Sequence, residues 1–316
     1  ELGARVAVRL SNSIKDGYGF PKRLVAPVVR SGIKLLILVD CGTNQAQEIR
    51  ALSDRGIHTI VLDHHLPVEP IAQPVALVNP HRDRGVGLGL SSVGLALKLA
   101  QAIWSGDLDR LTRYLDLVAL GTLADCAPLV GENRMLVTTG LARLLQTPRP
   151  GLARLCEAVK LTTPTPEQVL HRLTPRLNAI GRLGNPRPAW KLLVERSAHA
   201  VQRLVDVLTQ AHETTKALTR QMISEAHEQV NRLHFKDQFV MVIGRRGWHP
   251  GLMGPLASQL VNRYARPAIA IAMDERVGVG SGRSISAFDL FEALRACEGT
   301  LLRYGGHQQA CGLTIR

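Results

Sequence analysis

Short apolar runs that end on polar residues alternate with helix-like segments through the first third of the chain. Three of these runs are rich in strand-forming residues: Lys34 to Val39, Thr59 to Leu62 and Val75 to Val78. Strands that alternate with helices favour a parallel sheet with helices on both faces. Because chemistry in such sheets gathers at the carboxyl ends of the strands, we expect Asp40 and the segment 63–65 to lie there.

The pattern turns helical from Leu90 onward, and its longest helical stretch lies between Val201 and Leu233. Apolar residues recur there with the period of one amphipathic helix, and no Gly or Pro interrupts them. A helix of about 30 residues spans about 45 Å, which is long enough to connect two domains as a rigid strut.

Two further strand-like runs, Gln238 to Ile243 and Ala268 to Met273, follow the long helix. We therefore predict an α/β protein of two domains. A parallel-sheet domain spans residues 1–195, the connecting helix spans 196–235, and a smaller α/β domain spans 236–316.

Charge and composition narrow the choice of partners. The 316 residues include 39 Lys and Arg against 26 Asp and Glu, so the formal net charge is +13. This charge favours nucleic acid as the partner, because neutralised phosphates release condensed counterions. The longest apolar runs are far shorter than the roughly 20 residues of a membrane span, so we expect no membrane partner.

The five cysteines are widely spaced and contain no Cys-x-x-Cys pair. This spacing argues against a zinc knuckle or a disulfide framework. We interpret the cysteines as reduced and the protein as cytoplasmic.

Three acidic or imidazole groups stand at predicted strand or helix ends: Asp40, the triplet Asp63-His64-His65, and Asp125. Carboxylates together with an imidazole suit manganese or magnesium. The alternative is that a lone Asp caps a helix or forms a turn. Adjacent histidines at a strand end are more informative, because they point to opposite sides of the backbone. One can bind metal while the other faces substrate.

Short motifs occur in a characteristic order along nearly the whole chain. In the first domain they are Asp16-Gly17-Tyr18-Gly19, Val39-Asp40-Cys41-Gly42, Asp63-His64-His65, Ala119-Leu120-Gly121-Thr122-Leu123-Ala124-Asp125, Gly131-Glu132-Asn133-Arg134, and Arg176-Leu177-Asn178-Ala179 with Gly181-Arg182-Leu183. In the second they are Gly247-Trp248-His249-Pro250-Gly251, Gly280-Ser281-Gly282-Arg283-Ser284 and Gly305-Gly306-His307. In these motifs the chain resembles the DHH phosphoesterases, and within them the RecJ exonucleases. The resemblance implies a DHH domain followed by a DHH-associated nucleic-acid-binding domain.

The resemblance also implies the roles of individual residues. Two divalent ions, manganese or magnesium, would be bound, with Asp40, His64 and Asp125 as ligands. Asp63 would orient the histidines, and His65 would polarise the scissile phosphate. Five further residues are implied to bind nucleic acid: Arg176, Arg182, Ser281, Arg283 and His307. We add Lys15, which lies where the chain departs from the family pattern.

Glycines and one tryptophan in the second domain carry further expectations. Gly280, Gly305 and Gly306 would let backbone amides approach a phosphate closely. Two roles are open for Trp248, which could stack a nucleic-acid base or fill the core of the domain.

The implied activity is stepwise hydrolysis of single-stranded DNA from its 5′ end to mononucleotides, in recombination and repair. Single-stranded DNA is then the expected partner, with a single-stranded-DNA-binding protein or a recombination helicase as the expected recruiting partner. Two alternatives stay open. One is a DHH phosphatase that acts on short oligoribonucleotides or a nucleotide bisphosphate, and the other is a catalytically dead homologue that binds DNA as a scaffold.

The chain departs from the RecJ pattern near its start. The resemblance leads us to expect a strand followed by an Asp-x-Asp cluster before Gly3, and the sequence does not contain it. We therefore expect an incomplete two-metal site and a nearly inactive chain. Ser13 also stands where an arginine for the 5′ phosphate is expected, and Lys15 offers a point charge instead of a planar fork.

Overall fold

The computed structural model describes residues 3–12, 14, 17, 19–83, 89–233 and 238–316. Ser13 and Lys15 lie outside the described residues. The chain divides into two compact units, residues 1–209 and 210–316, and the long helix α12 (Ala198–Val230) contributes to both. Within the described ranges, no helix is both long enough and apolar enough to cross a membrane.

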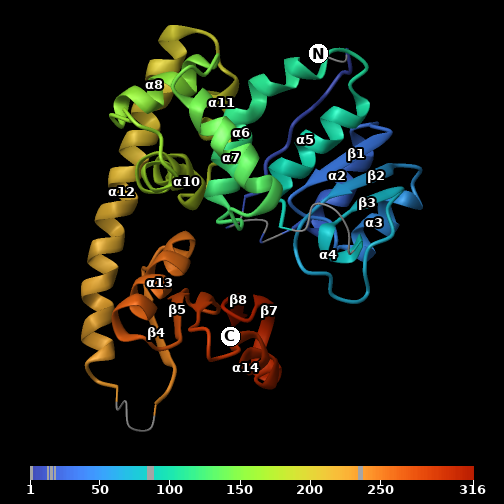
Figure 1. Cartoon of the computed structure of the whole chain (residues 1–316). Coiled ribbons are helices and arrows are strands. Elements are labelled where there is room, and N and C mark those ends of the chain that lie inside the picture. Colours follow the sequence, from blue (N-terminus) through green and yellow to red (C-terminus); the bar gives the residue numbers. More distant parts are fainter. Residues whose placement is uncertain (1–2, 13, 15–16, 18, 84–88, 234–237) are drawn as a thin grey trace. The chain divides into compact units, whose positions relative to one another are not determined.

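The first unit contains a three-stranded sheet. Its strands are β1 (Leu35–Val39), β2 (His58–Leu62) and β3 (Ala76–Val78). They lie in the order β1-β2-β3, and both neighbouring pairs are parallel (Figure 1). The predicted parallel sheet is confirmed, and each strand begins within one residue of the predicted run.

Helices cover both faces of this sheet. Alternate strand residues point to opposite sides, so neighbouring apolar residues of one strand pack against different helices. On one face Val61 packs in a cluster with α2 (Val25–Arg30) and α3 (Ala46–Ser53). On the other face Leu62 packs with α5 (Ser92–Ile103). The carboxyl ends of the strands are therefore held between helices on both sides.

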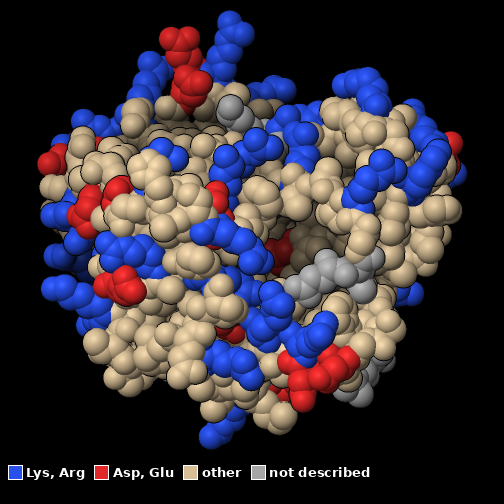
Figure 2. All heavy atoms as spheres, turned by 90° about the horizontal axis from the view of Figure 1, so that it is seen from above, with Lys and Arg blue, Asp and Glu red and all other residues tan. Residues whose placement is uncertain are grey.

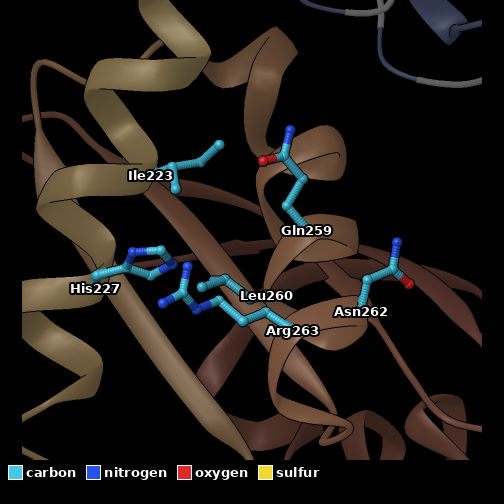
Figure 3. Close-up of a pocket in the computed structure, with 6 residues that line it drawn as sticks. All are labelled: Ile223, His227, Gln259, Leu260, Asn262 and Arg263. Carbon is cyan, nitrogen blue, oxygen red and sulfur yellow. The ribbon is translucent and has the colours of Figure 1, made fainter.

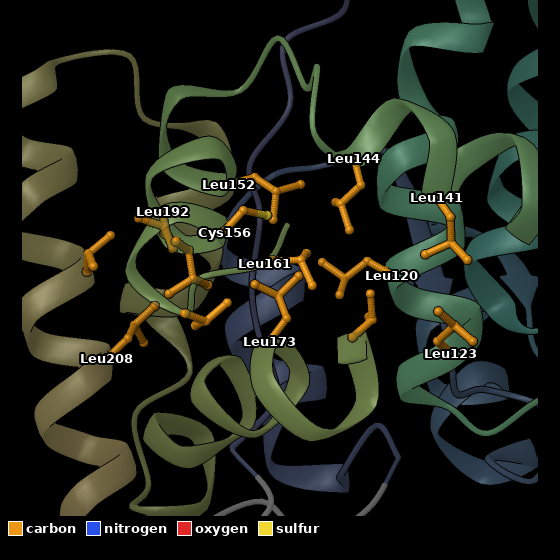
Figure 4. Close-up of a cluster of buried hydrophobic side chains, with 14 of the residues drawn as sticks. Leu120, Leu123, Leu141, Leu144, Leu152, Cys156, Leu161, Leu173, Leu192 and Leu208 are labelled. Carbon is orange, nitrogen blue, oxygen red and sulfur yellow. The ribbon is translucent and has the colours of Figure 1, made fainter. Parts of the chain in front are cut away.

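The rest of the first unit is helical. Its remaining elements are η1 (Lys22–Leu24), α4 (Pro80–Asp83), η2 (Leu108–Tyr114), α6 (Leu115–Ala124), α7 (Gly131–Leu144), α8 (Pro150–Ala158), α9 (Pro166–Gln168), the π-helical turn η3 (Val169–Leu173), α10 (Thr174–Arg182) and α11 (Arg187–Val194). One apolar cluster joins α6, α7, α8, α11 and the first half of α12, where Leu208 lies among the leucines of the other helices (Figure 4).

A buried ion pair fixes the first turn of α6. Asp116 is fully buried, and its carboxylate accepts hydrogen bonds from the Arg149 guanidinium at 2.6 and 2.8 Å and from the Thr147 hydroxyl at 2.6 Å. The guanidinium also lies 5.2 Å from the centroid of the Tyr114 ring. Because α6 leads directly into Asp125, this pair orients the helix that carries a predicted metal ligand.

The second unit is built on a five-stranded mixed sheet. Its elements are β4 (Met241–Arg246), η4 (Pro250–Leu252), α13 (Met253–Tyr264), β5 (Ala268–Met273), β6 (Gly278–Arg283), α14 (Leu290–Ala296), η5 (Glu298–Thr300), β7 (Leu301–His307) and β8 (Ala310–Ile315). The strand order is β4-β5-β6-β8-β7; β4 and β5 are parallel, and the other neighbouring pairs are antiparallel. The predicted second α/β unit is therefore confirmed.

The second half of α12 packs on this sheet. Met222 and Ala226 join a buried cluster with residues of β4, β5 and α13. Gln229 forms two hydrogen bonds of 3.2 Å with the backbone N–H and carbonyl of Gly244 in β4. The long helix predicted from the sequence is confirmed. Its apolar positions continue along its whole length because its first half packs in the core of the first unit and its second half in the core of the second.

Replacing Arg149 with Leu should lower the free energy of unfolding by about 3 to 5 kcal/mol, because the Asp116 carboxylate would stay buried without its cation. Chemical denaturation measures the change. The control is Arg154→Leu, which removes an exposed pair with Glu157 and should cost less than about 1 kcal/mol. Equal losses in the two variants would contradict the role given to the buried pair.

Candidate metal and nucleic-acid site

Asp40 occupies a tight turn at the carboxyl end of β1. Its backbone N–H donates to the Leu62 carbonyl at 2.9 Å, which continues the β1–β2 pairing by one residue. Its φ of 65° is left-handed, a conformation that Asp tolerates better than most residues. Gly42 follows with φ of 123°, and a Cβ there would lie 2.8 Å from Val61, so only glycine fits this close turn.

Asp63 is a buried carboxylate that organises the neighbouring strand end. It is 2% exposed. Its two oxygens accept hydrogen bonds from the backbone N–H groups of Thr43 (3.0 Å), His64 (2.9 Å) and His65 (3.2 Å), and from the Nδ1 of His65 (2.7 Å). Burial alone would raise the pKa of Asp63, but the hydrogen bonds from His65 and Thr43 outweigh it and lower the pKa to about 2.

His64 lies between two carboxylates. Its Nε2 is 3.3 Å from Oδ1 of Asp40 and 3.4 Å from Oδ2 of Asp125. The hydrogen bond to Asp40 raises the pKa of His64 and outweighs the burial that lowers it. The carboxylates that follow β1 and α6 therefore meet at the ring of the histidine that follows β2. Asp40 and Asp125 are 85 positions apart in the sequence.

Asp125 caps the carboxyl end of α6. Burial raises the pKa of its carboxyl, and the charge of Asp40 adds to the rise against the opposing charge of His64. The helix dipole places further negative potential at this end. A bound cation would relieve the repulsion among these groups.

The donor atoms fit a hard divalent ion. Adjacent ligands of an octahedral ion with metal–oxygen distances of about 2.1 Å lie about 3 Å apart, close to the two separations at His64. Of the residues described, Asp40, His64 and His65 also form a set whose candidate ligand atoms all lie within 4.8 Å of one another. Asp125, a predicted ligand, is not part of that set, whereas His65, which is predicted to act on the phosphate, belongs to it.

Two further residues at this sheet edge hold the loops of the candidate site, and this role was not predicted from the sequence. Thr43 and Asn79 are fully buried polar side chains, and both contact the loops that carry the acidic and imidazole groups. Asn79 follows β3 in the same way that Asp40 and Asp63 follow β1 and β2. That shared position after a strand was the available signal.

Ser281, Arg283 and His307 lie on one face of the second sheet. The register pairs Arg283 with Ala310 and Ala310 with His307, so these side chains share a face, as does Ser281 two residues before Arg283. Arg283 donates to the Ser281 hydroxyl at 2.9 Å and to the Gly282 carbonyl at 2.8 Å. The three predicted phosphate-binding residues are therefore brought together within this unit.

The predicted glycines divide between the two faces of this sheet. Gly305 lies on the same face of the sheet as Ser281. A Cβ there would meet no atom within 4 Å, so this part of the face is open. Gly306 has φ of 141°, and a Cβ there would lie 2.3 Å from the Ala310 carbonyl oxygen. A Cβ at Gly280 would lie 3.0 Å from the Ala270 carbonyl oxygen and 3.2 Å from Leu313, so close packing within the sheet favours glycine there.

Arg176 and Arg182 lie on α10 in the first unit. Arg182 is exposed at the last residue of the helix, and Arg176 donates to the Arg172 carbonyl at 2.6 Å. The Asn12 side chain donates to the carbonyl of Gly184, so the segment before Lys15 contacts the turn after Arg182. Lys and Arg side chains are spread over the face shown in Figure 2 and are more prominent there than Asp and Glu.

Trp248 fills the core of the second unit. It is 6% exposed, and its Nε1 donates to Glu225 on α12 at 2.6 Å. The core role is the one that the structure supports, and the ring is not presented to a nucleic-acid base.

A separate hollow of about 400 Å³ lies between α12 and α13. It is lined by Ile223, His227, Gln259, Leu260, Asn262 and Arg263 (Figure 3). Burial lowers the pKa of His227, and the charge of Arg263 lowers it further. None of the predicted site residues lines this hollow.

Two domain families match the chain. The DHH family N-terminal domain matches residues 3–122, and the DHHA1 domain matches residues 236–316. The first match contains Asp40 and the Asp63-His64-His65 triplet, and the second contains the face that carries Ser281, Arg283 and His307.

Proteins named single-stranded-DNA-specific exonuclease RecJ are similar over nearly the whole chain. The protein from Bacillus subtilis (strain 168) is 36% identical, over 100% of this chain and 40% of its own length. The one from Thermus thermophilus is 35% identical, over 99% of this chain and 46% of its own length. The chain thus spans about half the length of these curated relatives.

Solved structures agree with these relatives. A crystal structure of exonuclease RecJ bound to manganese has a TM-score of 0.82 at 33% identity, covering 98% of this chain and 77% of that one. A structure of RecJ from Thermus thermophilus in complex with Mn²⁺ has a TM-score of 0.83 at 34% identity, covering 94% of this chain and 44% of that one.

Replacing Asp63 with Asn should remove a pH-dependent part of the stability. The folded pKa of about 2 lies below the ordinary value, so the charge of Asp63 stabilises the fold above about pH 4 and this stability is lost as the pH falls toward 2. Near pH 5 the free energy of unfolding of the parent should exceed that of the variant by about 2 kcal/mol. This difference should shrink as the pH falls below about 4. Denaturation curves at several pH values measure it, with exposed Asp54→Asn as control. A gap that does not change with pH would contradict this assignment.

Proposed function

The chain belongs to the RecJ family of DHH phosphoesterases, and from this premise we propose that it forms the catalytic core of a metal-dependent exonuclease. The proposed reaction is stepwise hydrolysis of single-stranded DNA from the 5′ end to mononucleotides, in recombination and repair. We assign this activity to the cytoplasm, where a single-stranded-DNA-binding protein or a recombination helicase would recruit the enzyme.

The observation that carries this proposal is the position of His64 Nε2 between the carboxylates of Asp40 and Asp125, at 3.3 and 3.4 Å. Oxygen and imidazole donors at this spacing suit Mn²⁺ or Mg²⁺. The similar RecJ structures were solved in complex with manganese or Mg²⁺, which supports the same ions here. When bound, two such ions supply the charge that activates water and stabilises the leaving oxygen.

The protein residues have distinct roles in the proposed reaction. Asp40, His64 and Asp125 hold the ion, and Asp63 fixes the turn that presents both histidines. The Nδ1 of His65 is held by Asp63, and a hydrogen bond to Asp63 raises the pKa of His65. A protonated His65 ring can therefore donate toward a scissile phosphate and offset its negative charge.

The second unit would hold the strand by its phosphates. Arg283 offers a planar guanidinium that Ser281 orients, and exposed His307 shares the face. Arg176 and Arg182 would add phosphate contacts from the first unit, and Lys15 is proposed for the 5′ end. Because these groups contact the backbone and not the bases, the proposed binding does not depend on sequence.

The number of protein ligands limits what this chain does alone. Asp40, His64 and Asp125 suffice for one ion with water completing its shell, whereas a second ion needs ligands beyond these three. We therefore expect slow hydrolysis by the chain itself and faster hydrolysis by a form that supplies further carboxylates.

Labelled oligonucleotides test the proposal. The chain, and a form given an added N-terminal strand that ends in Asp-x-Asp, are incubated with Mn²⁺ and single strands labelled at either end. We expect release of the 5′ label as a mononucleotide, gradual shortening of the 3′-labelled strand, and no attack on blunt duplex. Turnover of dinucleotides alone would favour the phosphatase. Strand binding without hydrolysis in both forms would favour the scaffold.

The affinity for Mn²⁺ should rise with pH. The pKa of His64 is raised above its ordinary value of about 6.5, so a proton competes with the ion until the pH passes through that raised pKa. Calorimetry between about pH 6 and about pH 8.5 measures the trend. In Asp40→Asn the rise should begin at lower pH, because His64 loses the partner that holds its proton, and binding should be weaker throughout. An affinity that does not change with pH would contradict proton competition at His64.

Replacing Arg283 with Ala should weaken single-strand binding about tenfold and lower the slope of log affinity against log salt by about 0.7, because one phosphate contact is lost. Fluorescence anisotropy without divalent ions measures both. The matched control is Arg295→Ala on α14, which packs on the opposite face of the sheet and pairs with Glu292. Similar losses in both variants would show that general charge, and not this face, holds the strand.

A further inference from the structure

Asn79 ties the end of β3 to the two neighbouring strand ends. The β2–β3 register ends with Leu62 opposite Val78, and the backbone N–H of Asp63 donates to the Val78 carbonyl at 3.1 Å. Asn79 therefore begins where the pairing stops, directly beside the segment that carries the histidines. Its side chain is fully buried.

The amide of Asn79 makes contacts in three directions. Its Nδ2 donates to the Thr43 hydroxyl at 2.9 Å and to the His65 carbonyl at 2.9 Å. Its Oδ1 accepts the backbone N–H of His81 at 2.9 Å. A primary amide is the side chain that offers two donors and an acceptor in this geometry, so Asp or Leu cannot reproduce the set.

These contacts act on the same residue that Asp63 holds. His65 is fixed at its carbonyl by Asn79 and at its ring Nδ1 by Asp63, 2.7 Å away. Asp63 in turn accepts the backbone N–H of Thr43, whose hydroxyl Asn79 also contacts. Asn79, Thr43 and Asp63 thus form one buried network around the turn that presents His64 and His65.

We propose that Asn79 is a positioning residue for the histidine pair, acting through the His65 carbonyl. The proposal rests on the function proposed above. With its carbonyl held, the His65 ring keeps Nδ1 on Asp63, so Nε2 is the nitrogen that would act on a scissile phosphate. His64, one residue earlier on the same turn, keeps its Nε2 between Asp40 and Asp125.

Three variants separate positioning from general support of the fold. Asn79→Leu keeps the branched shape and removes both donors. Thr43→Val, the matched control, removes the other acceptor of Asn79 and the contact of the Thr43 hydroxyl with Asp63. It leaves the bond to the His65 carbonyl and the backbone N–H to Asp63. Asn79→Ser keeps a single donor and serves where Asn79→Leu does not fold, as circular dichroism would report.

Binding of Mn²⁺ is measured by calorimetry, and hydrolysis of single strands by kcat and KM. Loss of a residue that orients a metal ligand commonly costs about 10- to 100-fold, so we expect at least about tenfold weaker Mn²⁺ binding in Asn79→Leu and less than about threefold in Thr43→Val. In Asn79→Leu kcat should fall while KM for DNA stays unchanged, since the phosphate contacts lie elsewhere.

A third measurement needs neither metal nor activity. The ¹⁵N shifts of the His65 ring report its tautomer at a pH high enough for the ring to be neutral. In that neutral form we expect Nδ1–H alone in the parent and in Thr43→Val, but a mixture of tautomers in Asn79→Leu. Equal Mn²⁺ affinities, unchanged kcat and one tautomer in all variants would overturn the positioning role. A parent that neither binds Mn²⁺ nor cuts DNA, yet loses its single tautomer in Asn79→Leu, would overturn the proposed function and leave the positioning role standing.

Discussion

The buried carboxylate of Asp63 is the constraint on which the candidate site depends. A charge that is 2% exposed is costly unless hydrogen bonds replace its hydration. Three backbone N–H groups and the His65 ring supply those bonds, and they come from the loops after both β1 and β2. The same bonds that stabilise Asp63 therefore set the conformations of the two loops that carry the proposed metal ligands.

The fold delivers the remaining groups to this point by separate means. Parallel pairing of β1 with β2 places Asp40 beside the Asp63-His64-His65 turn, because the strands end together. Asp125 arrives on α6, whose first turn is fixed by the buried pair of Asp116 and Arg149. Burial raises the pKa of Asp125, and the charge of Asp40 adds to the rise. A divalent cation would offset both the lost hydration and the repulsion between the two carboxylates.

Much of this arrangement could be predicted from the sequence, because it follows from periodicity and from polar residues after strands. The parallel strands, the long helix and the second α/β unit come from such patterns and are confirmed. The roles of Thr43 and Asn79 could not be predicted, since a buried hydrogen-bond network depends on which loops meet in space. The same limit applied to Trp248, where the sequence left open whether the ring stacks on a base or fills the core, and burial in the folded domain selects the core.

Anomalous diffraction from crystals of the chain soaked in Mn²⁺ tests the central claim most directly. A manganese peak should lie within bonding distance of His64 Nε2 and of carboxylate oxygens of Asp40 and Asp125, with Asp63 still bonded to Thr43 and His65. A peak ligated by Asp63 itself, or one located away from His64, would contradict the division between a metal-binding group and the buried carboxylate that supports it.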